Sequence, residues 1–245
     1  MTGGGSGIGR AVCQRFAEEG ASLAILDIDE SGANETVRLI SDNGGTANCY
    51  RADISDYDAV VATISAVEED IGAIDILVNN AGWDVAKPFL ATEPALWRKI
   101  VDINLYGPLN MHHVVVGRMA QRGSGKVINV ASDAGRVGSS GEAVYSACKG
   151  GVIAFSKTLA RELARKNIQI NTVCPGPTDT PLFASFAGDD EQGRKLIDGL
   201  TRAIPMRRLG QPADYPGVIA FLASSDADYI TGQTISVSGG LTMHG

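Results

Sequence analysis

The chain has 245 residues, of which 44% are hydrophobic, and its formal net charge at pH 7 is −7. This composition supports a sizeable core, and the negative charge argues against a protein that binds nucleic acid or an acidic membrane surface. No apolar run reaches the roughly 18 residues of a membrane span, and no signal peptide is present. We therefore expect a soluble, cytoplasmic protein. The scattered cysteines, without CxxC spacing, predict reduced thiols and no metal site; they are Cys13, Cys49, Cys148 and Cys174.

The first predicted feature is a glycine-rich turn that leads into an amphipathic helix. The opening segment reads MTGGGSGIGRAVCQRFAEEG, with Gly3, Gly7 and Gly9 in the turn. Glycines let the backbone approach a phosphate, and the N-terminus of a helix favours an anion. The G-x-x-x-G-x-G spacing differs from the commonest dinucleotide fingerprint. Because flexible turns without a ligand look alike, this cluster needs support from the residues that follow.

Asp27 provides that support. Residues 22–26 form a short apolar segment that predicts a strand, and Asp27 follows it. An acidic residue roughly 20 positions after the glycines is where a Rossmann unit binds the 2′-hydroxyl of the adenosine ribose. A carboxylate there repels the 2′-phosphate of NADP, and residues 28–30 include no arginine or lysine. The pattern favours NAD, with a surface acid at a strand end as the alternative.

Strands and helices alternate along the rest of the chain. The expected helices cover residues 30–42, 59–71 and 94–122, and a further helix containing Tyr145 ends near Arg165. The expected strands cover residues 22–26, 45–52, 75–78, 126–130, 168–173 and 234–237. This alternation predicts an α/β fold: a single-domain Rossmann fold whose doubly wound parallel sheet carries helices on both faces. Without an internal repeat or a linker, we expect one NAD-binding domain over residues 1–245.

Ligands of such sheets bind at the carboxyl ends of the strands. The predicted strand ends bear polar or turn-forming residues, namely Asp27, Asp53, Asn79, Ser132 and the pair Pro175–Gly176. Because parallel strands end at the same edge, these residues are expected to share one site.

The segment SDAGRVGSSGEAVYSACK, residues 132–149, carries the candidate chemistry. Tyr145 precedes Lys149 by one helical turn, so both side chains are expected on one helix face. A neighbouring ammonium favours the phenolate and is expected to lower the tyrosine pKa from its ordinary value of about 10, which suits a general acid/base. Ser132 is expected to donate a hydrogen bond to the same substrate oxygen. The alternative is an ordinary amphipathic helix, on which such pairs are common.

Taken together, these segments resemble the short-chain dehydrogenase/reductase family. The resemblance rests on TGGGSGIG (2–9), NNAG (79–82), Ser132, YSACK (145–149) and PG (175–176), in family order over the whole chain. It implies an NAD(P)-dependent oxidoreductase. Tyr145 is implied as the catalytic acid/base, Lys149 as its stabiliser and ribose ligand, Ser132 as the substrate-oxygen donor, and Asn104 as the holder of a water relay to Lys149. The implied cofactor-binding residues are Gly3, Ser6, Gly7, Ile8, Gly9, Asp27, Asp53, Ile54, Asn79, Ala81, Gly82, Tyr145, Lys149, Pro175, Gly176, Thr178 and Thr180.

A narrower resemblance is to the family members that oxidise 2-hydroxycyclohexanecarboxyl-CoA. It rests on segments such as NNAGWD, ASDAGRVGSSGEAVYSACKGG, VCPGPTDT and SVSGGLTMHG. It implies oxidation of a cyclic β-hydroxyacyl-CoA with NAD during aromatic and alicyclic acid degradation, by a homotetramer. The alternatives are a 3-oxoacyl-[acyl-carrier-protein] reductase, which prefers NADPH, and a catalytically impaired nucleotide-binding protein.

The N-terminus departs from the family pattern. Members begin with an apolar strand before the TG turn, whereas only Met1 precedes Thr2 here. We interpret this as a truncated first strand, from a misplaced start or a shortened chain. Such a loss is expected to leave sheet edges uncovered, to lower stability and to weaken the anchoring of the phosphate-binding turn.

Overall fold

The computed structural model describes residues 1–188 and 190–243, and it has the Rossmann-like α/β fold that the alternation predicts. All strand pairings are parallel: β1 pairs with β2, and β3, β4, β5 and β6 follow one another in a second ladder. The strands are β1 (Ser22–Asp27), β2 (Thr46–Arg51), β3 (Ile76–Asn79), β4 (Gly125–Val130), β5 (Ile168–Pro175) and β6 (Thr234–Val237).

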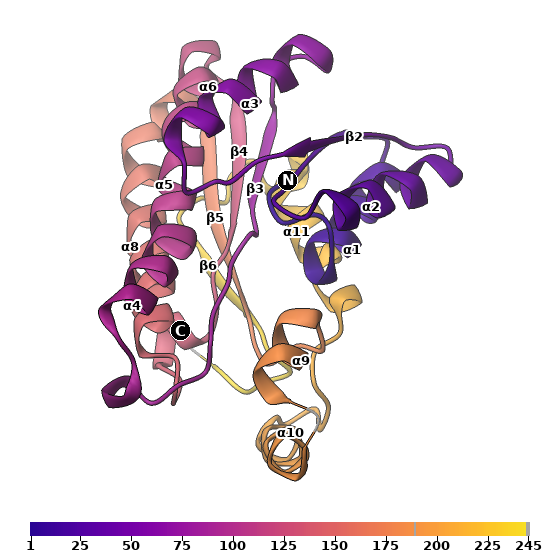
Figure 1. Ribbon diagram of the computed structural model, residues 1–245. Coiled ribbons are helices and arrows are strands. Elements are labelled where there is room, and N and C mark those ends of the chain that lie inside the picture. The colour runs from indigo at the N-terminus through magenta and orange to yellow at the C-terminus, as the bar shows by residue number, and fades with distance from the viewer. Residues whose placement is uncertain (189, 244–245) are drawn as a thin grey trace.

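Helices cover both faces of the sheet (Figure 1). One face carries α1 (Gly7–Glu18), α2 (Glu30–Asp42) and α11 (Pro216–Ala223). The other carries α3 (Tyr57–Asp70), α4 (Pro94–Val101), α5 (Gly107–Met111), α6 (Gly117–Arg122) and α8 (Ala143–Leu163). None of the helices in the described residues is long and apolar enough to span a membrane.

Strand alternation divides the core into two clusters. Successive residues of a strand point to opposite faces, so Ile128 of β4 packs in the cluster with Val12 of α1, while Val127 packs in the cluster with Ile64 of α3. The buried strands therefore read as nearly continuous apolar runs, as expected when both faces of a parallel sheet are covered.

The helical region 94–122 is continuous but not uniformly α-helical. Two π-helical stretches, Asp102–Tyr106 and His112–Val116, interrupt it and separate α4, α5 and α6. Apolar periodicity predicts the length of this region, but it does not distinguish a π turn from an α turn.

Three elements near the C-terminus were not predicted: α9 (Pro181–Ala187), α10 (Glu191–Ala203) and α11. Figure 1 shows α9 and α10 beyond the carboxyl ends of the strands. Thr180 caps α9 by accepting from the Phe183 N–H, and Asp190 caps α10 by accepting from the Gly193 N–H. Side-chain acceptors at N-caps are the usual start signal for a helix, so the starts of α9 and α10 could have been predicted from the sequence.

The first two residues lie between β1 and β3. Thr2 forms single parallel bridges with Leu26 and Asn79, donating its N–H to the Val78 oxygen at 3.0 Å. Its hydroxyl accepts from the N–H groups of Asn80 and Ala81 at 3.0 and 3.1 Å. Thr2 thus links the two ladders and connects the glycine-rich turn to the segment after β3.

Candidate functional site

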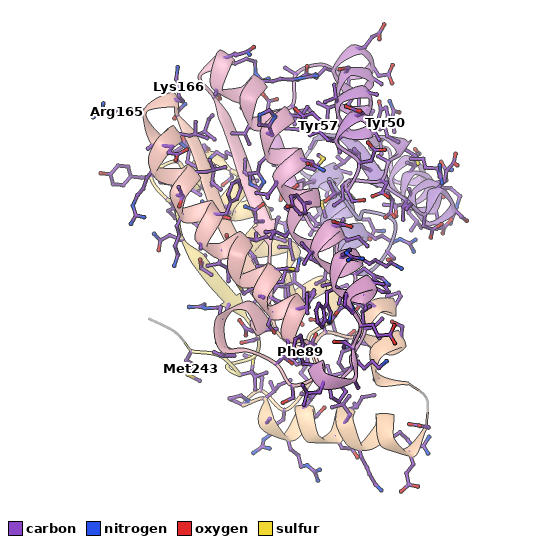
Figure 2. The ribbon with its side chains drawn as sticks, turned by 60° about the vertical axis from the view of Figure 1, so that its left-hand side comes forward. Tyr50, Tyr57, Phe89, Arg165, Lys166 and Met243 are labelled. Atoms are coloured by element: carbon purple, nitrogen blue, oxygen red, sulfur yellow. The ribbon has the colours of Figure 1, made fainter. Side chains whose placement is uncertain are left out.

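A cavity of about 1200 Å³ opens at the carboxyl ends of the strands. Figure 2 shows the direction: Arg165 and Lys166, just before β5, lie at one end of the molecule, and Phe89 and Met243 lie at the other. The glycine-rich turn, the ends of β1 to β5, the start of α8 and the α9–α10 segment contribute to the cavity wall. This is the edge at which the sequence predicts a shared site.

The glycine-rich turn fits a phosphate because side chains have no room there. Gly3 and Gly7 have positive φ values of +64° and +50°, a conformation that glycine adopts without strain. A Cβ on Gly9 would overlap the carbonyl oxygen of Gly3. Gly9 is therefore a packing residue: it lets α1 approach the turn but does not itself line the cavity.

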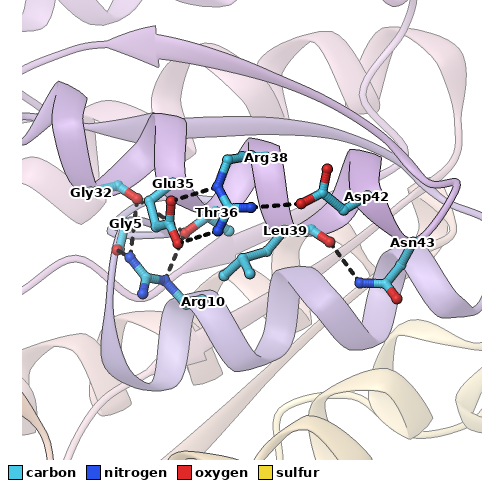
Figure 3. Close-up of polar contacts among 9 residues, drawn as sticks. All are labelled: Gly5, Arg10, Gly32, Glu35, Thr36, Arg38, Leu39, Asp42 and Asn43. Carbon is cyan, nitrogen blue, oxygen red and sulfur yellow. Dashed lines mark hydrogen bonds and ion pairs between the residues drawn. The ribbon is translucent and has the colours of Figure 1, made fainter.

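Asp27 lies in the cavity wall with its carboxylate held by backbone groups. Gly5 donates its N–H to Oδ2 at 2.8 Å, and Asp29 donates its N–H to Oδ1 at 3.0 Å. Figure 3 shows nearby Arg10, whose guanidinium donates to the carbonyl oxygens of Gly5 and Gly32 and to the Thr36 hydroxyl. Arg10 thus ties the turn to α2 through its Nε and Nη2 groups.

Ser132, Tyr145 and Lys149 all line the cavity. Ser132 follows β4, and Tyr145 and Lys149 lie one turn apart near the start of α8, as predicted. The Ser132 hydroxyl lies within hydrogen-bonding reach of the Tyr145 phenol. Lys149 is only 3% exposed and donates from Nζ to the Val130 oxygen at 3.0 Å.

The expected lowering of the Tyr145 pKa is wrong. Burial raises the pKa of Tyr145, the charges of Glu142 and Asp84 raise it further, and the hydrogen bond with Ser132 opposes them. Burial also lowers the pKa of Lys149 to about 8, which weakens its charge as a stabiliser of the phenolate. The prediction considered only the pair, whereas desolvation and two neighbouring carboxyl groups dominate.

Asn104 is fully buried behind the cavity wall. It lies in the π-helical stretch, donates from Nδ2 to the carbonyl oxygens of Trp83 and Ile100, and accepts at Oδ1 from the Trp83 N–H. A Cβ on Gly82 would lie 3.0 Å from the Asn104 Oδ1 and 3.4 Å from the Lys149 Nζ. The side chains of Asn104 and Lys149 therefore both approach Gly82. This closeness is needed if a water relay is to connect them.

The cavity wall contains most of the expected cofactor-binding residues. Those that line it are Gly3, Ser6, Gly7, Ile8, Asp27, Asp53, Ile54, Ala81, Gly82, Tyr145, Lys149, Pro175, Gly176, Thr178 and Thr180. Asn79 does not, because its amide points into the core and donates to Asn129 Oδ1 at 2.9 Å, and the next residue, Asn80, lines the cavity instead.

Asp84, which the expectations did not include, also lines the cavity. Glu142 lines it too: the sequence GSSGE at residues 138–142 predicts a loop beside the pocket, and Glu142 stands at the N-cap position of α8, three residues before Tyr145. Trp83 also lines the cavity, and the Lys99 Nζ lies 3.8 Å from the centroid of its ring.

The chemistry of the wall fits a nicotinamide dinucleotide. A side-chain-free turn at the start of α1 suits a pyrophosphate, and a strand-end carboxylate oriented by two N–H groups suits ribose hydroxyls. Both lie in the same cavity as Tyr145. No group of three or more His, Cys, Asp or Glu side chains in the described part of the chain could hold a metal ion.

Known proteins resemble this chain over nearly its full length. A family model described as enoyl-(acyl carrier protein) reductase matches residues 3–242. The (3R)-3-hydroxyacyl-CoA dehydrogenase of Homo sapiens is 37% identical over 252 residues, which cover 99% of this chain and 94% of that protein. The 3-oxoacyl-[acyl-carrier-protein] reductase FabG of Thermotoga maritima is 36% identical over 243 residues, covering 99% and 96%.

Two solved structures share the fold closely. Levodione reductase has a TM-score of 0.94 and 34% identity, and a single-substitution variant of actinorhodin polyketide ketoreductase with NADPH has a TM-score of 0.93 and 32% identity. Each comparison covers 98% of this chain and 95% of the other.

Proposed function

Because the chain belongs to the short-chain dehydrogenase/reductase family, we propose that it oxidises the secondary alcohol of a cyclic β-hydroxyacyl-CoA, such as 2-hydroxycyclohexanecarboxyl-CoA, to the β-ketoacyl-CoA with NAD. The observation that carries the proposal is the meeting of Ser132, Tyr145 and Lys149 in one cavity with the glycine-rich turn and Asp27. The thioester part of the proposal is supported by the identity to the human hydroxyacyl-CoA dehydrogenase.

In the proposed reaction, the Tyr145 phenolate accepts the proton of the substrate hydroxyl. Ser132 donates a hydrogen bond to the same oxygen and holds it beside Tyr145. NAD, held by the glycine-rich turn and Asp27, would supply the hydride acceptor for the carbinol carbon, so the alcohol would lose one proton to Tyr145 and one hydride and become a ketone. Lys149, fixed by the Val130 oxygen, stabilises the phenolate electrostatically, and Asn104 positions the relay that returns the proton to solvent.

NAD is proposed over NADP because Asp27 lines the cavity at the strand end where the family pattern puts the adenosine ribose. Two backbone N–H groups hold its carboxylate in place, and a 2′-phosphate beside it would bring two anions together. Arg38 pairs with Glu35 and Asp42, and Arg10 donates from Nε and Nη2 to Thr36, Gly5 and Gly32 (Figure 3). The NADPH of the polyketide ketoreductase structure makes the cofactor assay the decisive test.

A second candidate is a 3-oxoacyl-[acyl-carrier-protein] reductase, favoured by the 36% identity to FabG and by the matching family model. It runs the same chemistry in reverse, with Tyr145 as proton donor, and the raised pKa of Tyr145 suits that direction.

The proposal extends to the assembly and location of the protein. We propose one NAD-binding domain over residues 1–245 that works as a homotetramer in the cytoplasm. The support is the family pattern over the whole length and the exposed apolar side chains of Leu90, Tyr106 and Tyr229.

The test compares NADH formation from 2-hydroxycyclohexanecarboxyl-CoA with that from 3-hydroxybutyryl-CoA. We expect a clear preference for the cyclic thioester and for NAD over NADP. Equal rates with both thioesters would contradict the cyclic assignment. Faster reduction of a 3-oxoacyl-carrier substrate with NADPH would replace the proposal by the second candidate.

A further inference from the structure

Asp84 is a buried acid in the cavity wall without a partner. It lies two residues after Gly82 and is 8% exposed. Neither carboxylate oxygen has a hydrogen-bond partner among the described residues, although the Val85 N–H lies nearby. Buried carboxyl groups normally have donors or a counter-ion, because desolvation without them is costly. An unpaired one that lines a cavity indicates a role toward what enters the cavity.

Glu142 places a second carboxyl group beside the first. It stands at the N-cap position of α8, but its side chain makes no capping hydrogen bond. The carboxyl instead lies close to Asp84 and to the Ser139 hydroxyl. Two carboxyl groups this close influence each other's ionisation, so Asp84 and Glu142 titrate as a coupled pair.

The pair is negatively charged at neutral pH. Burial and then the neighbouring Glu142 raise the pKa of Asp84 to about 6, and burial raises the pKa of Glu142. At pH 7 at least one carboxyl group is therefore ionised. No salt bridge to either residue is present within residues 1–188 and 190–243, and Lys149 directs its ammonium to Val130.

The groups that face the pair do not neutralise it. Tyr145 and Cys148 of α8 both feel the charge of Asp84, and burial raises the pKa of each, which keeps them uncharged. The segments that carry Asp84 and Glu142 are joined by a hydrogen bond from the Lys87 N–H to the Gly141 oxygen. The side chain of Lys87 itself is exposed. Arg98 and Lys99 also line the cavity, but neither forms a salt bridge with the pair, and the Lys99 ammonium lies over the Trp83 ring. The part of the wall formed by Asp84 and Glu142 therefore carries negative charge without a paired counter-ion among the described residues.

We propose that Asp84 and Glu142 act as a charge filter in the substrate cavity, which admits β-hydroxyacyl groups as neutral thioesters and rejects the same hydroxy acids as free carboxylates. The inference rests on the proposed oxidation at Tyr145, because that reaction fixes the carboxyl carbon two bonds from the reacting carbon. A free carboxylate there meets the charge of the pair in a partly desolvated space, where repulsion is stronger than in water. A thioester carbonyl carries no charge and escapes that repulsion.

The test compares how tightly the protein binds a neutral and an anionic probe of similar size and shape. The affinities of cyclohexanecarboxamide and cyclohexanecarboxylate for the NAD-saturated protein are measured by calorimetry at pH 7.5. The variants are Asp84→Asn and Glu142→Gln, which keep size and remove charge. The matched control is Glu93→Gln, at the N-cap position of α4, where the acid is exposed, makes no capping bond and lies outside the cavity wall.

We expect the wild type to bind the amide at least tenfold more tightly than the carboxylate. Each cavity variant is expected to reduce that ratio at least fivefold, and Glu93→Gln to leave it unchanged. We also expect kcat/KM to be higher for the N-acetylcysteamine thioester of 2-hydroxycyclohexanecarboxylic acid than for the free acid, and the cavity variants to reduce this difference. The wild-type ratio should also fall as the pH is lowered below 6, because the pair then takes up protons.

A wild-type ratio near one, ratios unchanged in both cavity variants, or no binding of either probe would overturn the inference. Should Asp84→Asn fail to fold, Glu142→Gln alone decides, since its side chain is only half-buried. Failure of the proposed function gives a different result: the protein still binds the amide more tightly than the carboxylate, but it does not oxidise the thioester.

Discussion

The Lys149 ammonium nitrogen lies 3.0 Å from the carbonyl oxygen of Val130, to which it donates, and 5.5 Å from the centroid of the Tyr145 ring. The hydrogen bond ties the start of α8 to the last residue of β4 and fixes the charge below the tyrosine ring. Lys149 is thereby a positioned cation. Tyr145 is a buried phenol that keeps its proton, because burial and the charges of Glu142 and Asp84 raise its pKa. The predictions below follow from this arrangement.

Replacing Tyr145 by Phe keeps the ring and removes the proton carrier. Because general acid/base catalysis contributes about 10²–10⁴-fold, we expect kcat to fall by about that factor while NADH binding stays nearly unchanged. Steady-state turnover and a fluorescence titration with NADH measure the two quantities. Tyr106→Phe, at an exposed tyrosine, is the control. Near-normal turnover of Tyr145→Phe would contradict its assignment.

The pH dependence of oxidation should report the Tyr145 phenol. Its pKa is raised above the ordinary value, so the fraction of phenolate, and with it kcat/KM for the alcohol, rises as the pH rises. Neutralising Glu142 or Asp84 removes a charge that raises this pKa, and the rise should move to lower pH in Glu142→Gln and Asp84→Asn. Rate profiles between pH 6 and pH 10 measure the shift. Profiles that coincide with that of the wild type would show that the pair does not act on Tyr145.

Asp84→Asn should stabilise the protein at alkaline pH. The pKa of Asp84 in the folded protein, about 6, lies above the unfolded value of about 3.9, so its ionised form opposes folding. The penalty is complete above the folded pKa and disappears as the pH falls below the unfolded one. We expect a gain of about 2 kcal/mol in the free energy of unfolding at pH 8, and little change at pH 4. Urea unfolding at both pH values measures it, and an equal effect at both would reject the buried-charge explanation.

Asp27 should determine the choice of cofactor. In Asp27→Ser the repulsion of a 2′-phosphate is removed along with the ribose contact, so the ratio of kcat/KM for NAD to that for NADP should fall about tenfold, equivalent to about 1.4 kcal/mol. The control is Asp29→Ser, which removes the same charge from a residue that does not line the cavity. An unchanged ratio in Asp27→Ser would remove the basis for preferring NAD.

Gly9→Ala should disrupt the turn that Gly9 packs against. Its Cβ would overlap the Gly3 carbonyl oxygen, so α1 must move away from the turn. We expect a loss of roughly 3 kcal/mol in stability, typical of overpacking, together with weaker cofactor binding. Gly117→Ala, a helical site with nothing within 4 Å of the added atom, should instead gain about 1 kcal/mol from helix propensity. Thermal unfolding of both variants makes the comparison, and equal stabilities would refute the packing role.

The sequence alone determined the alternation of elements and the end of the sheet at which the site lies. Apolar runs ending in Asp27 and Ser132, and the one-turn spacing of Tyr145 and Lys149, are local patterns, so they could be read without coordinates. Helix periodicity likewise predicted the full extent of the 94–122 region.

Only the tertiary structure decided which side chains face the cavity and how their charges act. Asn79 turns into the core because Asn129 of the neighbouring strand accepts from its amide, and Asn80 takes the place in the wall. The Tyr145 pKa is raised by burial and by Asp84, a residue far from it in the sequence. Desolvation and the meeting of distant carboxyl groups depend on packing between elements, and no spacing along the chain contains that information.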